Sequence, residues 1–219
     1  MSSIFVLGAT GRTGEHVVNY ALSKGHSVTA LVREPAKLTS REGLTVVKGT
    51  PEGQDDISAA IRGTDAVISA LGNVRTSDMP WAKPVSPRHF MTEATRKTVR
   101  VMKANGVRRI VIVSALGVGD SLSVTPAYLR WTVKFTNLGT TYADHNELDA
   151  EIRQADVDWT LLWAVLLTNS PNARQLQVRF VPDKPAGMRI SRREVARFAV
   201  DALADGTLIG RAPIISSAK

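Results

Sequence analysis

The chain has 219 residues, of which 43% are hydrophobic and 22% charged, as in ordinary globular proteins. It lacks cysteine, which excludes disulfides and thiolate metal sites, and no apolar run is long enough to predict a membrane-spanning helix. The formal net charge of +8 admits nucleic acid, a membrane surface or an anionic ligand as a partner. Because the cations are scattered, without a zinc-finger or aromatic RNA-binding pattern, we expect neither nucleic acid nor a membrane.

Short apolar runs alternate with helical patterns from one end of the chain to the other. Strands are predicted at residues 4–7, 28–32, 44–48, 65–70, 108–114, 158–163 and 213–215. Helices are predicted at residues 13–24, 55–62, 88–105, 142–154 and 191–204. This alternation predicts one α/β domain over residues 1–219, with a doubly wound, Rossmann-type parallel sheet covered by helices on both faces. The first strand follows the N-terminus without a charged and apolar leader, which favours a cytoplasmic protein.

A glycine-rich motif, GATGRTG, occupies residues 8–14 between the first predicted strand and the first predicted helix. Glycines at such a junction allow a tight turn and let the backbone approach a pyrophosphate, which the N–H groups at the helix start then bind. In an alternating α/β chain, this position favours dinucleotide binding over a simple tight turn. The predicted cofactor contacts in the loop are Gly8, Thr10, Gly11, Arg12, Thr13 and Gly14.

The end of the second predicted strand indicates which dinucleotide binds. Enzymes that use NAD usually place an acidic residue there to bind the ribose hydroxyls, whereas this chain has Arg33. An arginine pairs instead with the 2′-phosphate of NADP(H), and Arg12 and Lys37 can add to that contact. Glu34 is the counter-argument, but its side chain should point to the opposite face if the strand continues. The two arginines therefore favour NADP(H) as the cofactor.

With these motifs the chain resembles the atypical short-chain dehydrogenase/reductase superfamily. Within it, the chain is most similar to the NmrA-like NAD(P)H-binding group that includes flavin reductase (biliverdin reductase B). The segments that carry the resemblance are residues 8–14, 31–33, 65–72, 102–107, 144–145 and 190–191. The resemblance implies that Leu71 and Gly72 line the ribose and nicotinamide side of the cofactor. It also places Thr50 near the adenine, where the group usually carries an aspartate.

Three departures from the group bear on its chemistry. The Tyr-x-x-x-Lys pair of ordinary short-chain dehydrogenases is missing at both candidate tyrosines, Tyr128 and Tyr142. The usual Ser-Ser at the end of the fifth strand is Ser-Ala at 114–115, and the usual Arg-Pro after the sixth strand is Trp-Ala at 163–164. If the second serine is the one that faces the nicotinamide, Ser114 points away from it. A standard carbonyl-reductase mechanism is therefore not expected.

His145 is the leading acid–base candidate. The resemblance places it where relatives carry a lysine or histidine close to the nicotinamide ribose, and a histidine titrates near neutrality. Tyr142 can share its helical face, and Ser114 completes the candidate catalytic set. The alternatives are a solvent-facing histidine and a tyrosine that only packs. Asp149 and Glu147 are expected to be helix-surface charges, and no spacing of His, Asp and Glu suggests a metal.

The aromatic residues are unevenly distributed, because eight of the twelve lie between positions 81 and 163. In a doubly wound sheet, ligands bind beyond the carboxyl ends of the strands. Segments 72–90, 115–142 and 163–190 are therefore predicted to form a flat pocket for a planar or polycyclic substrate. The predicted lining residues are Trp81, Trp131, Trp163 and Leu116. The alternative is that most of these rings belong to the core.

The leading functional hypothesis is an NADPH-dependent reductase that transfers hydride to a flavin, a tetrapyrrole or a quinone-like or polycyclic metabolite. Such an acceptor, stacked on the nicotinamide, needs only a weak proton donor. Two alternatives keep the fold: a non-redox isomerase, epimerase or cyclase, and an NADP(H)-sensing regulator without catalysis. The expected partner is a small molecule, and the chain is expected to be a monomer or a dimer.

Overall fold

The computed structural model describes residues 1–39, 41–171 and 174–218. Its strands are β1 (Ser3–Leu7), β2 (Ser27–Val32), β3 (Leu44–Lys48), β4 (Ala66–Ser69), β5 (Arg109–Ala115), β6 (Asp158–Ala164), β7 (Leu166–Thr168), β8 (Leu176–Arg179), β9 (Arg189–Ser191) and β10 (Ile214–Ser217). Its helices are α1 (Gly14–Ser23), α2 (Gln54–Ile61), α3 (Phe90–Ala104), α4 (Ala127–Phe135), α5 (Leu138–Gln154) and α6 (Arg192–Asp201). Short 3-10 turns occupy Pro35–Lys37, Gly119–Val124 and Gly206–Leu208. None of the helices described here is long and apolar enough to cross a bilayer.

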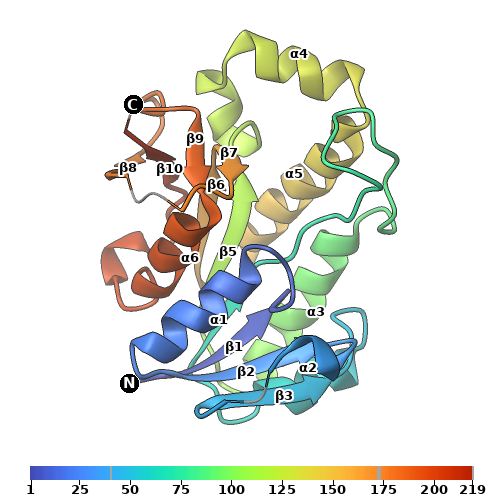
Figure 1. Ribbon diagram of the computed structural model, residues 1–219, viewed down its shortest axis with the longest axis vertical. Coiled ribbons are helices and arrows are strands. Elements are labelled where there is room, and N and C mark those ends of the chain that lie inside the picture. Colours follow the sequence, from blue (N-terminus) through green and yellow to red (C-terminus); the bar gives the residue numbers. More distant parts are fainter. Residues whose placement is uncertain (40, 172–173, 219) are drawn as a thin grey trace.

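An eight-stranded sheet forms the centre of the molecule, in the order β3-β2-β1-β4-β5-β6-β10-β8 (Figure 1). Its strands pair in parallel, except that β8 pairs antiparallel with β10 at one edge. Strands β7 and β9 form a separate parallel pair. The predicted Rossmann-type architecture is therefore confirmed, with one antiparallel edge strand added.

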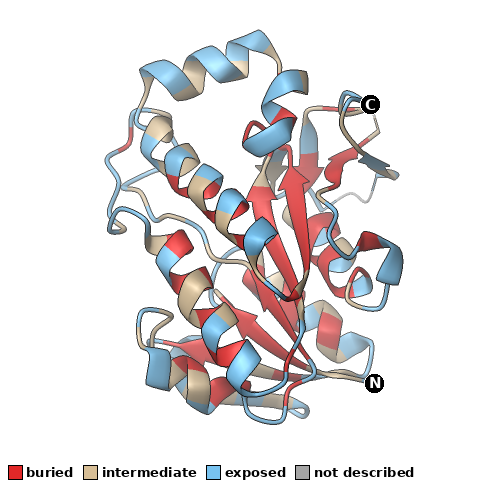
Figure 2. Ribbon diagram, turned by 180° about the vertical axis from the view of Figure 1, so that it is seen from behind, coloured by how far each residue is buried: buried red, intermediate tan, exposed pale blue. Residues whose placement is uncertain are grey.

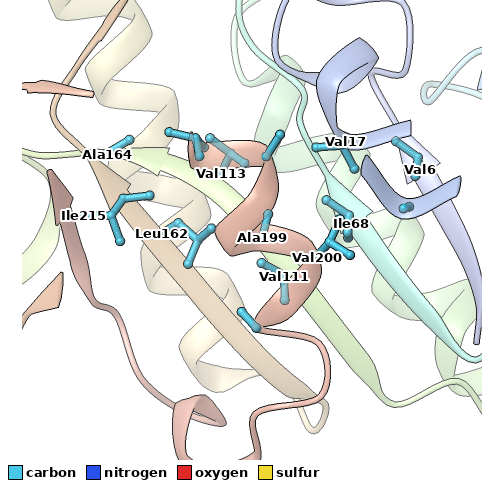
Figure 3. Close-up of a cluster of buried hydrophobic side chains, with 14 of the residues drawn as sticks. Val6, Val17, Ile68, Val111, Val113, Leu162, Ala164, Ala199, Val200 and Ile215 are labelled. Carbon is cyan, nitrogen blue, oxygen red and sulfur yellow. The ribbon is translucent and has the colours of Figure 1, made fainter. Parts of the chain in front are cut away.

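Alternation of side chains along each strand divides the core into two halves. In β1, Ile4 and Val6 pack on the side of α1 and α6, whereas Phe5 and Leu7 pack on the side of α2, α3 and α5. Figure 3 shows the first half, where valines of the sheet meet alanine and valine side chains of α6. Figure 2 shows α3 and α5 across the opposite face, with buried residues turned to the sheet. Both faces of the central strands are thus covered, which explains their continuous apolar runs.

The strand order fixes where a ligand would bind. From β1 the chain adds β2 and β3 on one side and β4, β5 and β6 on the other, so the order reverses between β1 and β4. Loops at the carboxyl ends of these two strands leave a crevice in doubly wound folds. Residues 8–14 follow β1 and residues 70–89 follow β4. Figure 1 shows α4 at the top of the molecule, apart from the helices that cover the sheet.

The predicted strands and helices are all present, with ends that differ by a few residues, but several elements were missed. Helix α4 was not predicted, because its sequence AYLRWTVKF mixes aromatic and β-branched residues and it buries no residue that would give it a clear periodicity. Helix α5 begins at Leu138, before the predicted residue 142, and strands β7, β8 and β9 are only three or four residues long.

Candidate functional site

The loop at residues 8–14 turns sharply because its glycines stand where a side chain does not fit. Gly8 has a φ of +78°, and a Cβ there would lie 2.7 Å from the carbonyl oxygen of Ala70, just beyond β4. A Cβ on Gly14 would collide with the carbonyl oxygen of Gly8. The N–H of Gly11 donates to that same oxygen at 2.9 Å and closes the turn. The loop therefore brings the start of α1 against the end of β4, at the reversal of strand order.

The start of α1 suits a bound pyrophosphate. Thr13, which precedes the helix, makes no side-chain capping bond to its first N–H groups. Those groups carry the partial positive charge of a helix N-terminus, which attracts anions. Thr10 and Gly11 are exposed beside them. A tight glycine turn and a helix start without a side-chain cap are what a pyrophosphate needs, so the residues present fit a dinucleotide.

Arg12 already binds an oxyanion in the structure. Its two terminal nitrogens donate to the two carboxylate oxygens of Asp78 at 2.6 and 2.7 Å. Asp78 lies in the long segment after β4, and the hydrogen bond from Arg12 holds its pKa below the ordinary value. A bidentate guanidinium binds a phosphate with similar geometry. Arg12 is thus oriented to hold an oxyanion beside the glycine loop.

The cations after β2 lie at the surface. Arg33 directly follows β2 and is exposed, and within the described residues its side chain makes no hydrogen bond or ion pair. The ammonium of Lys37 binds the carboxylate of Glu34 at 3.0 Å. Glu34, the acidic residue that could bind ribose hydroxyls instead of a 2′-phosphate, is therefore paired with Lys37. The guanidinium of Arg33 is exposed, and its N–H donors have no partner among the described residues.

The adenine-side and nicotinamide-side positions lie near the carboxyl ends of β3 and β4. Thr50 stands two residues beyond β3, and its N–H donates to the carboxylate of Asp56 in α2 at 2.9 Å. Position 50 lacks the aspartate that the related group usually carries there, but the carboxylate of Asp56 lies beside it. Leu71 is half-buried against the core, and a Cβ on Gly72 would meet nothing within 4 Å. The contacts of these residues with a cofactor stay predictions.

Ser114 and His145 form a buried polar pair. Ser114 lies near the end of β5 on the face that α5 covers, and its hydroxyl is 3.1 Å from Nδ1 of His145. His145 is 8% exposed, so it is not a solvent-facing residue. Burial lowers its pKa to about 4, although the neighbouring Asp144 carboxylate acts in the opposite direction. The expectation that it titrates near neutrality therefore does not hold in the folded chain, where the imidazole is neutral.

We expect the buried neutral His145 to make the protein less stable in acid. The unfolded histidine takes up a proton below about pH 6.5, whereas the folded one does so only near its pKa of about 4, so falling pH favours unfolding across this window. The loss should be on the order of 2 kcal/mol at about pH 5. Urea unfolding at neutral and acidic pH would show this loss in the wild type and not in His145→Gln. An equal loss in both proteins would mean that His145 is not responsible.

Asp144 connects α5 to the start of α3 and to the segment after β4. Its carboxylate accepts the N–H groups of Met91 at 2.9 Å and Thr92 at 3.0 Å, the hydroxyl of Thr92 at 2.7 Å and the side-chain amide of Asn73 at 3.0 Å. Burial raises the pKa of this carboxyl, but the hydrogen bonds lower it more, so its net pKa lies below the ordinary value. This network fixes the turn of α5 that carries His145.

Tyr142 shares the helical face of His145, with ring centroids 6.3 Å apart in an edge-on arrangement. Burial raises the pKa of its hydroxyl, so the phenol stays protonated at neutral pH. Its ring borders a largely apolar cavity of about 100 Å³. The other lining residues are Gly117, Leu122, Thr125, Leu129, Arg130, Val133 and Lys134. Drug-sized ligands occupy roughly 300–1,000 Å³, so this cavity would hold one ring or substituent of a larger ligand.

The four residues predicted to line an aromatic pocket do not come together. Trp163 is 2% exposed, and its indole N–H donates to the carboxylate of Asp149 at 3.0 Å. Leu116 is also buried in the core, so for these two residues the core alternative is correct. Trp81 and Trp131 are about two-thirds exposed, at 65% and 64%. The prediction that Asp149 is a surface charge was wrong, because it is buried beneath Trp163.

Comparison with known proteins agrees with the dinucleotide binding that the glycine loop predicts. A model of the NAD(P)H-binding family matches residues 8–206. The chain belongs to this family. An uncharacterized chloroplastic protein of Arabidopsis thaliana is 32% identical over 213 residues, which are 91% of this chain and 71% of that protein. An isoflavone reductase homolog of Zea mays is 38% identical over 87 residues, which are 35% of this chain and only 28% of the maize protein.

Solved structures confirm the fold of this NAD(P)H-binding protein. ChuY, an anaerobilin reductase from Escherichia coli O157:H7, superposes with a TM-score of 0.80 and 18% identity over 99% of this chain and 97% of ChuY. A short-chain dehydrogenase/reductase from Veillonella parvula, solved in complex with NADP, has a TM-score of 0.79 and 17% identity over 99% of this chain and 94% of that chain. At such identities the likeness shows the fold alone. It confirms the predicted Rossmann-type fold.

Sequence reasoning missed two residues of the site of this NAD(P)H-binding protein and the role of a third. Asp78 and Asn73 lie in a loop without periodicity, and nothing local indicates that they bind Arg12 and Asp144. The sequence motif did single out Asp144, but not its role as a helix cap, because its partners lie more than fifty residues away. Among the described residues, no group of three His, Asp or Glu side chains is placed to hold a metal ion.

Proposed function

We propose that this NAD(P)H-binding protein is an NADPH-dependent reductase that transfers hydride to a planar conjugated acceptor, such as a flavin, a tetrapyrrole or a quinone-like metabolite. The observation that carries the proposal is the neutral character of the acid–base groups beyond β5. His145 is deprotonated, Tyr142 is protonated, and Asn146 stands where ordinary short-chain dehydrogenases have a lysine.

The choice of NADPH rests on the cations around the glycine loop. Arg12 already holds a carboxylate in bidentate fashion, and Arg33 lies exposed at the end of β2. Glu34 is bound by Lys37, which weakens its case as a ribose ligand. A guanidinium binds phosphate more strongly than it binds a ribose hydroxyl, because both partners are charged.

Asp78 should compete with the cofactor phosphate for Arg12. We expect Asp78→Asn to tighten NADPH binding by a few-fold, because exposed ion pairs contribute no more than about 1 kcal/mol. The affinity for NADH should not change, since NADH offers no 2′-phosphate to Arg12. Fluorescence titration of both cofactors against wild type and variant measures the effect. Weaker NADPH binding in the variant would show that Asp78 supports the site instead of competing for it.

The neutral site determines which acceptor can be reduced. Bound NADPH supplies the hydride. A simple carbonyl would leave a localised alkoxide, whereas Arg153, the only cation of α5, is already paired with Asp149 and Asp120. A conjugated acceptor spreads the negative charge over its rings and then needs only a proton. The hydroxyl of Ser114 and the ring of His145 form a short path, 3.1 Å from Oγ to Nδ1, along which a proton can be held or passed.

The acceptor class is tested by the loss of NADPH absorbance with flavins, tetrapyrroles and quinones, compared with simple aldehydes and ketones. We expect oxidation with at least one conjugated acceptor and turnover about 100-fold lower, or none, with simple carbonyls. No turnover with any conjugated acceptor, although calorimetry shows NADPH bound, would contradict the proposal. A product formed without net oxidation of NADPH would indicate an isomerase or cyclase instead.

A further inference from the structure

Helix α4 and the segment after β4 expose a cluster of large apolar side chains. Tyr128, Trp131 and Phe135 of α4 are 61%, 64% and 56% exposed, and their spacing of three and four residues places them along one side of the helix. Met79 and Trp81 of the other segment are 59% and 65% exposed. We call these five residues the α4 surface. Exposed apolar clusters of this kind mark interaction sites.

The two parts of the α4 surface are neighbours. The side-chain amide of Asn137, two residues beyond Phe135, donates to the backbone carbonyl of Trp81 at 2.6 Å. Helix α4 buries none of its residues, and its Leu129 and Val133 line the cavity beside Tyr142. Figure 2 shows α4 standing off the sheet, exposed or half-exposed along its length. The aromatic residues of α4 are thus not needed to pack the helix onto the core.

The charges around the α4 surface are positive. Arg130 and Lys134 lie on α4, which contains no acidic residue, and Lys134 stands over the Phe135 ring at 5.5 Å. Lys83 is exposed two residues beyond Trp81. The nearby Asp78 carboxylate is bound by Arg12. The α4 surface therefore has exposed cations beside its aromatic rings, and two of them, Arg130 and Lys134, also line the cavity beside Tyr142.

We infer that the α4 surface docks on a lipid bilayer that contains anionic headgroups. Tryptophan and tyrosine prefer the interface between headgroups and acyl chains, and cations beside them attract anionic lipids. A second copy of the chain fits less well, because a two-fold contact would bring together two copies of the same surface, whose unpaired charges are all positive. Binding at a surface needs no spanning helix. This inference is independent of the proposed reductase activity, and it departs from the expectation from sequence that no membrane is a partner.

Sedimentation with lipid vesicles tests the inference. The wild-type chain should pellet with vesicles of phosphatidylcholine and phosphatidylglycerol, and much less with phosphatidylcholine alone. The double variant Trp131→Ser with Phe135→Ser should bind anionic vesicles about tenfold less or weaker still, because it loses the groups that enter the interface. The double variant Arg130→Gln with Lys134→Gln should lose the preference for anionic vesicles.

The control variant Lys24→Gln with Arg62→Gln removes the same charge at the opposite ends of the strands, and it should bind as the wild type does. Equal loss in this control would show a general effect of net charge and would overturn the inference. So would absence of wild-type binding to anionic vesicles. A dimer in sedimentation velocity that only the aromatic variant abolishes, without vesicle binding, would assign the surface to a second copy. Binding of polyglutamate without binding of vesicles would assign it to an acidic protein.

Discussion

Replacing both Arg12 and Arg33 by methionine is expected to weaken NADPH binding by about 100-fold or more and to leave NADH binding nearly unchanged. Hydrogen bonds to charged groups contribute about 1.5–3 kcal/mol each, and every 1.4 kcal/mol is a factor of ten in affinity. Arg12 already demonstrates the required geometry by its bidentate contact with Asp78. Calorimetric titration of both cofactors against wild type and variant measures the effect. Methionine keeps most of the side-chain length and removes only the charge and the donors.

The matched control is Arg41→Met with Arg62→Met. Both residues are exposed, and both lie toward the amino ends of the strands, away from the glycine loop. This variant loses the same formal charge, so any long-range attraction of the anionic cofactor is reduced equally. If the control weakened NADPH as much as the site variant, the arginines would act only through net charge. If the site variant weakened NADH equally, they would bind a part common to both cofactors.

Replacing Asp144 by alanine is expected to destabilise the fold by about 3 kcal/mol, because several donors would be left without a partner. The carboxylate accepts two backbone N–H groups at the start of α3, from Met91 and Thr92, as well as the side chains of Thr92 and Asn73. Asp144 is 3% exposed, so water cannot easily replace it. Urea unfolding at neutral pH measures the loss. His145 follows directly in the chain, so the proposed reductase activity should fall as well.

Two comparisons separate this capping role from a general effect of mutation. Asp144→Asn keeps a hydrogen-bond acceptor and should lower the free energy of unfolding less than Asp144→Ala does. Asp205→Ala removes an exposed carboxylate that accepts the N–H of Thr207, and it should lower the free energy of unfolding far less. Because the folded pKa of Asp144 is lowered, its contribution is fully present above the ordinary carboxyl pKa of about 4. It is lost only as the pH falls through the lowered folded value. A small loss of stability in Asp144→Ala at neutral pH would show that the network carries little energy.

Local patterns made most of the fold predictable. The glycine loop could be located because the required backbone conformations depend on residues within a few positions of each other, as the positive φ of Gly8 shows. Seven of the strands and five of the helices could be predicted from their apolar runs and periodicity. Their order and direction followed from the alternation of the two element types. The antiparallel edge strand β8 could not be foreseen, because it has four residues, none of them buried.

The site was predictable only where its residues stand close together in sequence. Arg12 and Asp78 are 66 residues apart, and Asp144 lies 52 residues from Thr92, so their contacts depend on the completed fold. Trp163 was assigned to a pocket because strand ends often contact ligands, yet its indole reaches across to Asp149 in α5. The pKa of His145 also depends on burial, which the sequence alone does not reveal.

The central claim is that Arg12 of the glycine loop and Arg33 after β2 select the cofactor that carries a 2′-phosphate. Calorimetric titration of the wild-type chain with NADPH and with NADH is its most direct test. We expect NADPH to bind at least about tenfold more tightly than NADH, because only NADPH carries the 2′-phosphate that we expect Arg12 and Arg33 to bind. Equal affinities for the two cofactors, or binding of neither, would contradict the claim.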